Sequence, residues 1–98
     1  MSINYDNLDK KLSHIVDSFK GSWCEVCIKD VSDLIYMREY KIAIELLCEN
    51  LQEDSVPISE DVYLSITEVC EIMHVESVYW KNLPSLITDK GSVGYPKN

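Results

Sequence analysis

The sequence predicts an all-α fold, a compact bundle of about five helices that forms a single domain over residues 1–90. The chain has 98 residues, which is enough for one small domain. Of these residues 46% are hydrophobic and 27% are charged, so the chain can bury a core. Glycine and proline together number six, which is few for a fold made of tight hairpins. The apolar residues recur at helical spacing throughout.

The first helix is expected over residues 4–20. Its apolar residues are three, four, three, one and three positions apart, so they share one side of a helix: Tyr5, Leu8, Leu12, Ile15, Val16 and Phe19. Gly21 is well placed to end this helix, because glycine adopts the left-handed backbone of a helix C-terminus without steric cost.

The next helical pattern runs from residue 22 to residue 54, with Ser22 as its expected N-cap. Two apolar sets follow each other along it: Trp23, Val26, Cys27, Val31, Leu34 and Ile35, then Tyr40, Ala43, Ile44, Leu47, Cys48 and Leu51. A single helix of this length would be unusual, since the mean α-helix has about 11–12 residues. We therefore expect a bend or short turn near residues 37–39, although no glycine or proline marks it there.

A clear break comes at residues 54–57, because Pro57 disfavours the α conformation in the residue before it. Ser59 then suits an N-cap, and Ile58 and Tyr63 occupy the two positions of a hydrophobic staple. The helix after Ser59 has an expected buried row: Val62, Ile66, Val69, Cys70 and Met73.

The last helix is expected to be short. Ser77 can cap it, Pro84 bends or ends it, and Leu86 and Ile87 close over the core. The final residues, 91–98, are expected to form a flexible C-terminal tail.

The sequence favours a cytoplasmic protein. The first residues alternate charged with apolar side chains and contain no continuous apolar stretch, so no signal peptide is expected. No run approaches eighteen apolar residues, so no membrane-spanning helix is expected either. The four cysteines (Cys24, Cys27, Cys48 and Cys70) are expected to be reduced and to pack as small hydrophobic core residues.

Charge is unevenly distributed along the chain. Seventeen acidic residues against nine basic ones give a net charge of −8, which argues against binding of nucleic acid or anionic membranes. Between Glu45 and Glu76 there are nine acidic residues and no lysine or arginine. Glu45, Glu49 and Glu53 would share one helix face, where like charges repel by about 0.2–0.5 kcal/mol per pair.

Two interpretations of this acidic region stay open. It is either a solvated face of an acidic protein or a surface complementary to a basic partner, which would accelerate association. If it binds a partner, the candidate contact residues are Glu45, Glu49, Glu53, Asp54, Glu60, Asp61 and Tyr63, the last as an aromatic anchor.

The sequence contains little that indicates catalysis, and we expect no enzyme activity, cofactor or metal. It has no glycine-rich phosphate loop and neither of the HExxH and GxSxG motifs. Cys24 and Cys27 have the CxxC spacing of zinc and redox sites. However, a zinc site would need a second pair of ligands, and a thioredoxin-like site would need a strand before the motif. Core packing is therefore the expected role of these cysteines.

The middle of the chain carries a family resemblance. The relevant residues are the run from Ala43 to Leu51, Val56-Pro-Ile-Ser59 and Tyr63-x-x-Ile66. With them, the region from about residue 39 to residue 87 resembles the MafI-type immunity proteins of contact-dependent growth inhibition (CdiI) and polymorphic toxin systems. The family usually has a glycine before its counterpart of Tyr40, where this chain has Arg38 and Glu39.

The resemblance implies an all-α inhibitor that binds one cognate nuclease toxin domain, such as an EndoU-like or other ribonuclease, as a 1:1 heterodimer. It also implies no direct contact with nucleic acid and a monomer when free. The alternatives are an acidic secretion chaperone or adaptor, an acidic nucleic-acid mimic, and a zinc-binding domain that uses Cys24 and Cys27.

Overall fold

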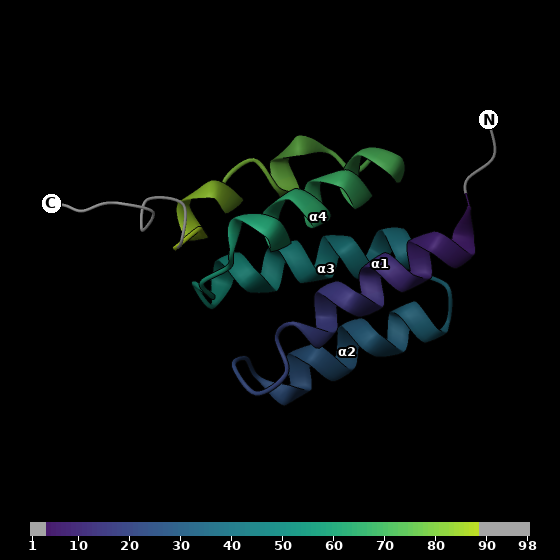
Figure 1. Cartoon of the computed structure of the whole chain (residues 1–98), viewed down its shortest axis with the longest axis horizontal. Helices are drawn as coiled ribbons and strands as arrows, with labels where there is room; N and C mark the ends of the chain where they lie inside the picture. Colours follow the sequence, from purple (N-terminus) through teal and green to yellow (C-terminus); the bar gives the residue numbers. More distant parts are fainter. Residues whose placement is uncertain (1–3, 89–98) are drawn as a thin grey trace, which may run out of the picture.

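The computed structural model describes residues 4–88, and these residues form an all-α bundle, as predicted (Figure 1). The elements follow one another as α1 (Tyr5–Asp17), α2 (Glu25–Tyr36), α3 (Tyr40–Glu53), α4 (Glu60–Ile72) and the 3₁₀-helices η1 (Ser77–Tyr79) and η2 (Leu83–Leu86). The predicted tail at residues 91–98 lies outside the described residues. No helix in residues 4–88 combines the length and apolar character that crossing a membrane requires.

Helix α3 is the central element of the bundle. It packs against α1, α2 and α4 and also contacts η1 and η2, whereas α1 lies between α2 and α4 in the view of Figure 1. The buried side of α3 consists of Tyr40, Ala43, Ile44, Leu47, Cys48 and Leu51, as the apolar spacing predicted. Each fully buried leucine or isoleucine contributes about 1.5–3 kcal/mol, so this side of α3 is a major part of the core.

Helix α1 begins as predicted and ends earlier than predicted. The Asn4 side chain caps it by accepting a hydrogen bond from the Asn7 amide at 3.0 Å. The α-helix ends at Asp17 because the amides of Phe19 and Lys20 bond three residues back, to Val16 and Asp17, in a tighter turn. Gly21 has the expected positive φ of 85°, in the loop after this turn.

The predicted break near residues 37–39 is confirmed: α2 ends at Tyr36 and α3 begins at Tyr40. Arg38 has a φ of 62°, and the amide of Glu39 bonds to the carbonyl of Leu34 at 2.8 Å. This pattern is a Schellman ending, which reverses the chain after a helix and normally places glycine at the left-handed position. Here Arg38 occupies that position, so no glycine marks the turn in the sequence.

The ends of α3 and α4 repeat this arrangement. Ser55 and His74 have φ values of 51° and 57°, and the amides of Val56 and Val75 bond to the carbonyls of Leu51 and Cys70. Both valines are buried, which is the hydrophobic contact that accompanies a Schellman ending. All three of these helix ends therefore hold a non-glycine residue in the left-handed region.

The start of α2 differs from the prediction. Ser22 does not cap it, since its hydroxyl donates back to the Phe19 carbonyl at 3.1 Å, and Cys24 is the N-cap. Val26 was expected in the buried row but is 65% exposed, whereas Ile28 is buried. Two residues correspond to about 200° of rotation on a helix, so these two side chains point in opposite directions.

The start of α4 is as predicted. The Ser59 hydroxyl accepts a hydrogen bond from the Val62 amide at 3.1 Å, Ile58 is buried, and Tyr63 is half-buried against the core. Ile58 also forms a parallel bridge with Ile87, through its amide to the Leu86 carbonyl at 3.0 Å. The segment after α4 is thereby tied to the loop before it.

The expected last helix is instead two short 3₁₀-helices. Glu76, and not Ser77, occupies the N-cap position of η1, and no side chain caps it. Pro84 lies in the first turn of η2, where its missing amide hydrogen removes no helical bond. Leu86 and Ile87 pack against the core as predicted.

The cysteines divide into two pairs. Cys48 and Cys70 are fully buried, as expected, and their mutual hydrogen bond, followed by burial, raises the pKa of the Cys48 thiol strongly. The prediction of core packing is wrong for the other pair, because Cys24 is exposed and Cys27 is half-buried at the start of α2. The helix begins two residues later than expected, which leaves Cys24 outside the core.

The left-handed residues predict a gain in stability on substitution by glycine. Arg38→Gly should raise the free energy of unfolding by about 0.5–1 kcal/mol, because the left-handed strain exceeds the entropic cost of glycine. The matched control is Lys10→Gly, at an exposed position within α1, which should lower it by about 1 kcal/mol. Urea unfolding followed by circular dichroism measures both, and destabilisation by Arg38→Gly would contradict the role assigned to this turn.

Candidate functional site

Three of the predicted contact residues form one stripe on α3. Glu45, Glu49 and Glu53 are separated by single helical turns on the side opposite the buried row. Glu49 and Glu53 are exposed, and Glu45 is half-buried. Ile42 lies on the same side of the helix and is 51% exposed, so the stripe contains an apolar residue beside its carboxylates.

The 3₁₀-helix η1 is fixed against this stripe. The side-chain amide of Gln52 donates one hydrogen bond to the Tyr79 carbonyl at 2.7 Å and another to the Cys48 carbonyl at 3.0 Å. The Trp80 indole donates to the Val75 carbonyl at 3.2 Å, which holds the chain before η1. Between α3 and η1 lies an open hollow of about 390 Å³, lined by Glu49, Gln52, Val78 and Tyr79.

The electrostatics of Tyr79 show how its neighbours are arranged. The negative charge of Glu45 is the largest cause that raises the pKa of the Tyr79 phenol, followed by burial and by the charges of Glu49 and Glu76. Negative neighbours disfavour the phenolate, so the phenol stays protonated and can donate a hydrogen bond. We call this region the α3–η1 surface and define it by Ile42, Glu45, Glu49, Gln52, Glu53, Glu76, Val78 and Tyr79.

Asp54 was predicted to belong with the α3 stripe, but its side chain lies elsewhere. One of its carboxylate oxygens, Oδ2, accepts a hydrogen bond from the Trp23 indole at 3.1 Å and a weak one from the Cys27 thiol at 3.9 Å. Asp54 is the C-cap of α3, so its side chain leaves the helix in a different direction from that of Glu53. The Asp54 side chain therefore contacts residues at the start of α2 and not the glutamates of α3.

The predicted residues on α4 also lie apart from the stripe. Glu60 and Asp61 are exposed in the first turn of α4, and Tyr63 is half-buried. Asp61 lines a small groove of about 70 Å³ with residues of α1, including His14 and Ser18. The predicted set is thus divided among the stripe of α3, the start of α2 and the seam between α1 and α4.

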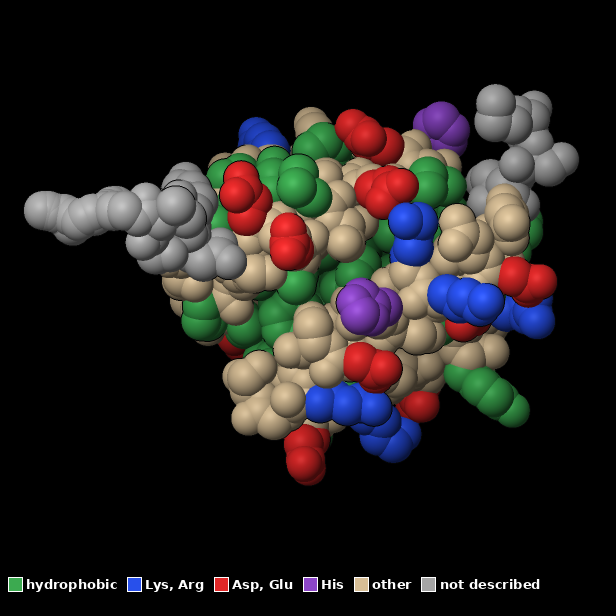
Figure 2. All heavy atoms as spheres, in the orientation of Figure 1, with side chains coloured by type: hydrophobic (Ala, Val, Ile, Leu, Met, Phe, Trp, Pro, Cys, Tyr) green, Lys and Arg blue, Asp and Glu red, His purple; other side chains and the backbone are tan. Residues whose placement is uncertain are grey.

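The face formed by α1, α2 and α4 has a mixed charge pattern. Figure 2 shows acidic side chains over α4 and lysines interspersed with acidic residues over α1 and α2. A salt bridge of 3.0 Å between Lys11 and Glu68 crosses from α1 to α4, and another of 2.8 Å joins Lys29 to Asp33 within α2. Positive side chains therefore accompany negative ones here, unlike the residues that form the α3–η1 surface.

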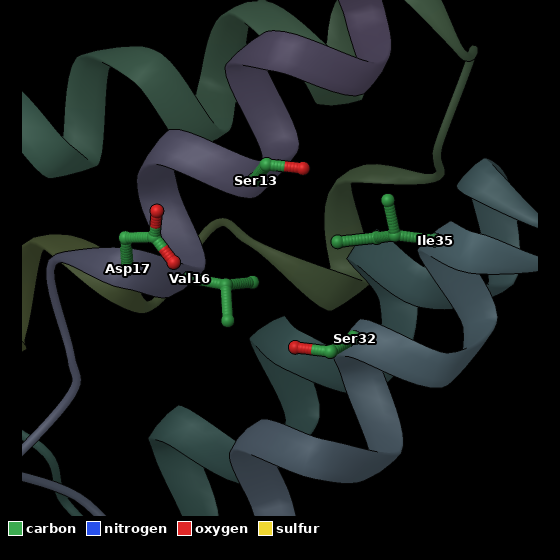
Figure 3. A pocket seen from close by; sticks show the side chains of 5 residues that line it. All are labelled: Ser13, Val16, Asp17, Ser32 and Ile35. Carbon is green, nitrogen blue, oxygen red and sulfur yellow. The ribbon is translucent and has the colours of Figure 1, made fainter.

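A hollow between α1 and α2 is too small to hold a substrate. Its volume is about 80 Å³, against about 300–1,000 Å³ for typical ligand pockets. Figure 3 shows its lining side chains, which are Ser13, Val16, Asp17, Ser32 and Ile35. Within residues 4–88, no three histidine, cysteine, aspartate or glutamate side chains are grouped to hold a metal ion.

The contribution of η1 to the site was not predicted from the sequence. Glu76 was counted among the nine acidic residues, but nothing placed it, Tyr79 or Val78 beside α3. The contact depends on Gln52, which reaches a carbonyl 27 residues away in the chain. No spacing rule connects residues at that separation.

Comparison of the chain with protein-family models, with curated proteins and with solved structures gives no match.

The arrangement around Tyr79 predicts a measurable titration. Glu45→Gln should lower the pKa of Tyr79 towards the ordinary tyrosine value, because it removes the largest negative influence on the phenol. Tyrosine ring carbons labelled with ¹³C report the titration by NMR, and Asp33→Asn on α2 is the control that should leave it unchanged. An unchanged Tyr79 titration in Glu45→Gln would show that α3 and η1 are not in contact.

Proposed function

We propose that this chain is an immunity protein that neutralises a nuclease toxin domain by covering a basic surface of that domain with its α3–η1 surface. The observation that carries the proposal is a set of four carboxylates, those of Glu45, Glu49, Glu53 and Glu76, on one surface. The same surface holds the exposed side chains of Ile42 and Val78 and the half-buried ring of Tyr79. Like charges at successive turns of α3 repel one another and gain nothing for folding. A positively charged partner would offset the repulsion among these glutamates by binding to them.

The composition of the α3–η1 surface supports a protein partner. Ile42 and Val78 are 51% and 60% exposed, and Tyr79 lines the hollow together with Val78. Protein interfaces typically combine an apolar or aromatic centre with a polar rim. A solvated acidic face would need no exposed apolar side chains among its carboxylates.

The chemistry of nucleases supports a toxin of that class. Nuclease clefts are lined with lysine, arginine and histidine, which hold the phosphates of the substrate. A carboxylate surface can occupy such a cleft or overhang it, and no reaction is then required of the inhibitor. The resemblance to MafI-type immunity proteins implies the same role, a 1:1 complex and action in the cytoplasm.

The residues proposed to contact the partner differ from those expected from the sequence. The proposed contact surface keeps Glu45, Glu49 and Glu53 and adds Glu76 and Tyr79, because the charges of Glu45, Glu49 and Glu76 all act on the Tyr79 phenol. Asp54 is left out because Trp23 and Cys27 already engage its carboxylate. Asp61, with its neighbour Glu60, lies at the seam of α1 and α4 and would contact only a partner that extends around α4.

The secretion chaperone alternative receives less support. Such chaperones are commonly α/β homodimers, and residues 4–88 of this chain form an all-α bundle with one isolated bridge between Ile58 and Ile87.

The proposal predicts a position-dependent effect of charge reversal. The test uses the nuclease-like C-terminal domain of a large secreted protein encoded beside this chain, and measures binding by calorimetry and ribonuclease activity in parallel. Glu49→Lys with Glu53→Lys should weaken binding at low salt by at least ~10-fold, mainly through the association rate. It should release the ribonuclease from inhibition to the same degree.

A matched control separates this effect from net charge. Asp17→Lys with Asp33→Lys changes the net charge equally and places lysines near the C-terminal ends of α1 and α2, where they suit the helix dipoles. These substitutions break exposed ion pairs, which contribute at most about 1 kcal/mol each. Equal loss of binding in both variants would refute the α3–η1 surface as the interface, and full ribonuclease activity in the presence of excess wild-type protein would refute the function.

A further inference from the structure

The two accessible cysteines lie together at the start of α2. Cys24 is the N-cap, with an extended backbone, and Cys27 follows in the first turn of the helix. Side chains three positions apart on a helix have Cβ atoms about 5–6 Å apart, and a disulfide needs about 3.5–4.5 Å. Closing that difference requires Cys24, which lies outside the helix proper as the N-cap, to move towards Cys27.

The carboxylate of Asp54 contacts Cys27, and the indole of Trp23, the residue before Cys24, bonds to the same carboxylate. Asp54 comes from the C-terminal end of α3, and its Oδ2 accepts from the Cys27 thiol at 3.9 Å and from the Trp23 indole at 3.1 Å. The Trp23 ring packs edge-on against Phe19 with 5.5 Å between the ring centroids, and Phe19 is buried. The residue before Cys24 is therefore anchored to the core, and a proton acceptor lies beside Cys27.

The pKa of the Cys24 thiol is lowered and that of the Cys27 thiol is raised, and thiol–disulfide exchange needs one such acidic thiol. The backbone of Cys27 and Val26 lowers the pKa of the exposed Cys24 thiol, and the Cys27 thiol adds to this. Burial raises the pKa of Cys27, as do its hydrogen bond to Cys24 and the negative charges of Cys24, Asp54 and Asp30. A thiolate is the attacking species in thiol–disulfide exchange, so Cys24 is the nucleophile and Cys27 resolves the intermediate.

We propose that Cys24, Cys27 and Asp54 form a thiol–disulfide exchange site that takes small-molecule disulfides of the glutathione disulfide class. The Cys24 thiolate attacks one sulfur of the disulfide, forms a mixed disulfide and releases one thiolate, which takes a proton from water. Cys27 then gives its proton to Asp54, and its sulfur attacks the Cys24 sulfur. The second thiolate leaves and accepts that proton, so two protein thiols are oxidised and one disulfide is reduced to two thiols.

The buried pair provides an internal comparison. Cys48 and Cys70 are fully buried between α3 and α4, and the pKa of the Cys48 thiol is strongly raised. A buried thiol of raised pKa is inert towards exchange. The site at α2 is also independent of the partner proposed for the α3–η1 surface, so either proposal can fail alone.

The test is to treat the full-length protein with glutathione disulfide, block the remaining thiols with an alkylating reagent, and map the products by mass spectrometry. Wild-type protein should form a Cys24–Cys27 disulfide and leave Cys48 and Cys70 alkylated after unfolding. Cys27→Ser should instead accumulate one glutathione on Cys24, and Cys24→Ser should remain unmodified at Cys27. Both variants change accessible positions, and circular dichroism checks that they are folded.

Two kinetic measurements test the roles of the individual groups. Alkylation of Cys24 in Cys27→Ser, followed against pH, should show a midpoint below that of an unstructured cysteine peptide and a rate at neutral pH roughly tenfold higher. Asp54→Asn should leave this first step unchanged and slow closure of the mixed disulfide by at least ~10-fold, so that the glutathione adduct becomes visible. A midpoint at or above the peptide value, or a wild-type protein that keeps glutathione on Cys24 without closing, would overturn the proposal.

Discussion

The fold depends on the burial of one side of α3. Ala43, Ile44, Leu47, Cys48 and Leu51 are completely excluded from solvent, and helices from both halves of the chain pack on them. Within residues 4–88 no polar or charged residue is buried, so the core is held by apolar contact and not by internal ion pairs. Once this side of α3 is fixed, its opposite side must face outward. The glutamates there are exposed as a consequence of core packing.

The turns after α2, α3 and α4 determine where the other elements meet α3. Each turn holds a non-glycine residue, Arg38, Ser55 or His74, in the left-handed region. Such residues cost about 1–2 kcal/mol relative to ordinary backbone, and the surrounding packing must offset this. After the turns at Ser55 and His74, Val56 and Val75 are buried. The turn at His74 is followed directly by Glu76 and η1, so it positions the part of the surface that the sequence analysis missed.

Two regions of different chemistry result at α3. Along its outward side, Glu49 and Tyr79 line a hollow, and Glu45 lies near enough to influence the Tyr79 phenol. This is the region proposed to bind a partner of positive charge. At its C-terminal end, Asp54 turns away from this stripe to meet Trp23 and Cys27. Glu53 and Asp54 are adjacent in the chain, but their side chains lie in separate regions. The reason is that the helix ends between them, so the direction of the side chains changes.

The sequence by itself determined the helices, the apolar side of each and the glutamate stripe of α3. These features depend on helical periodicity and on local capping, such as that of Ser59, which act between residues a few positions apart. Tertiary structure decided the grouping of Asp54 with Cys27, and of Glu76 and Tyr79 with Glu45 and Glu49. It also decided that Val26 is exposed and Ile28 buried, since both are apolar and only the position of α3 beside α2 distinguishes them. Contacts of this kind join residues up to about thirty positions apart, and they exist only after the core has fixed how the helices lie against one another.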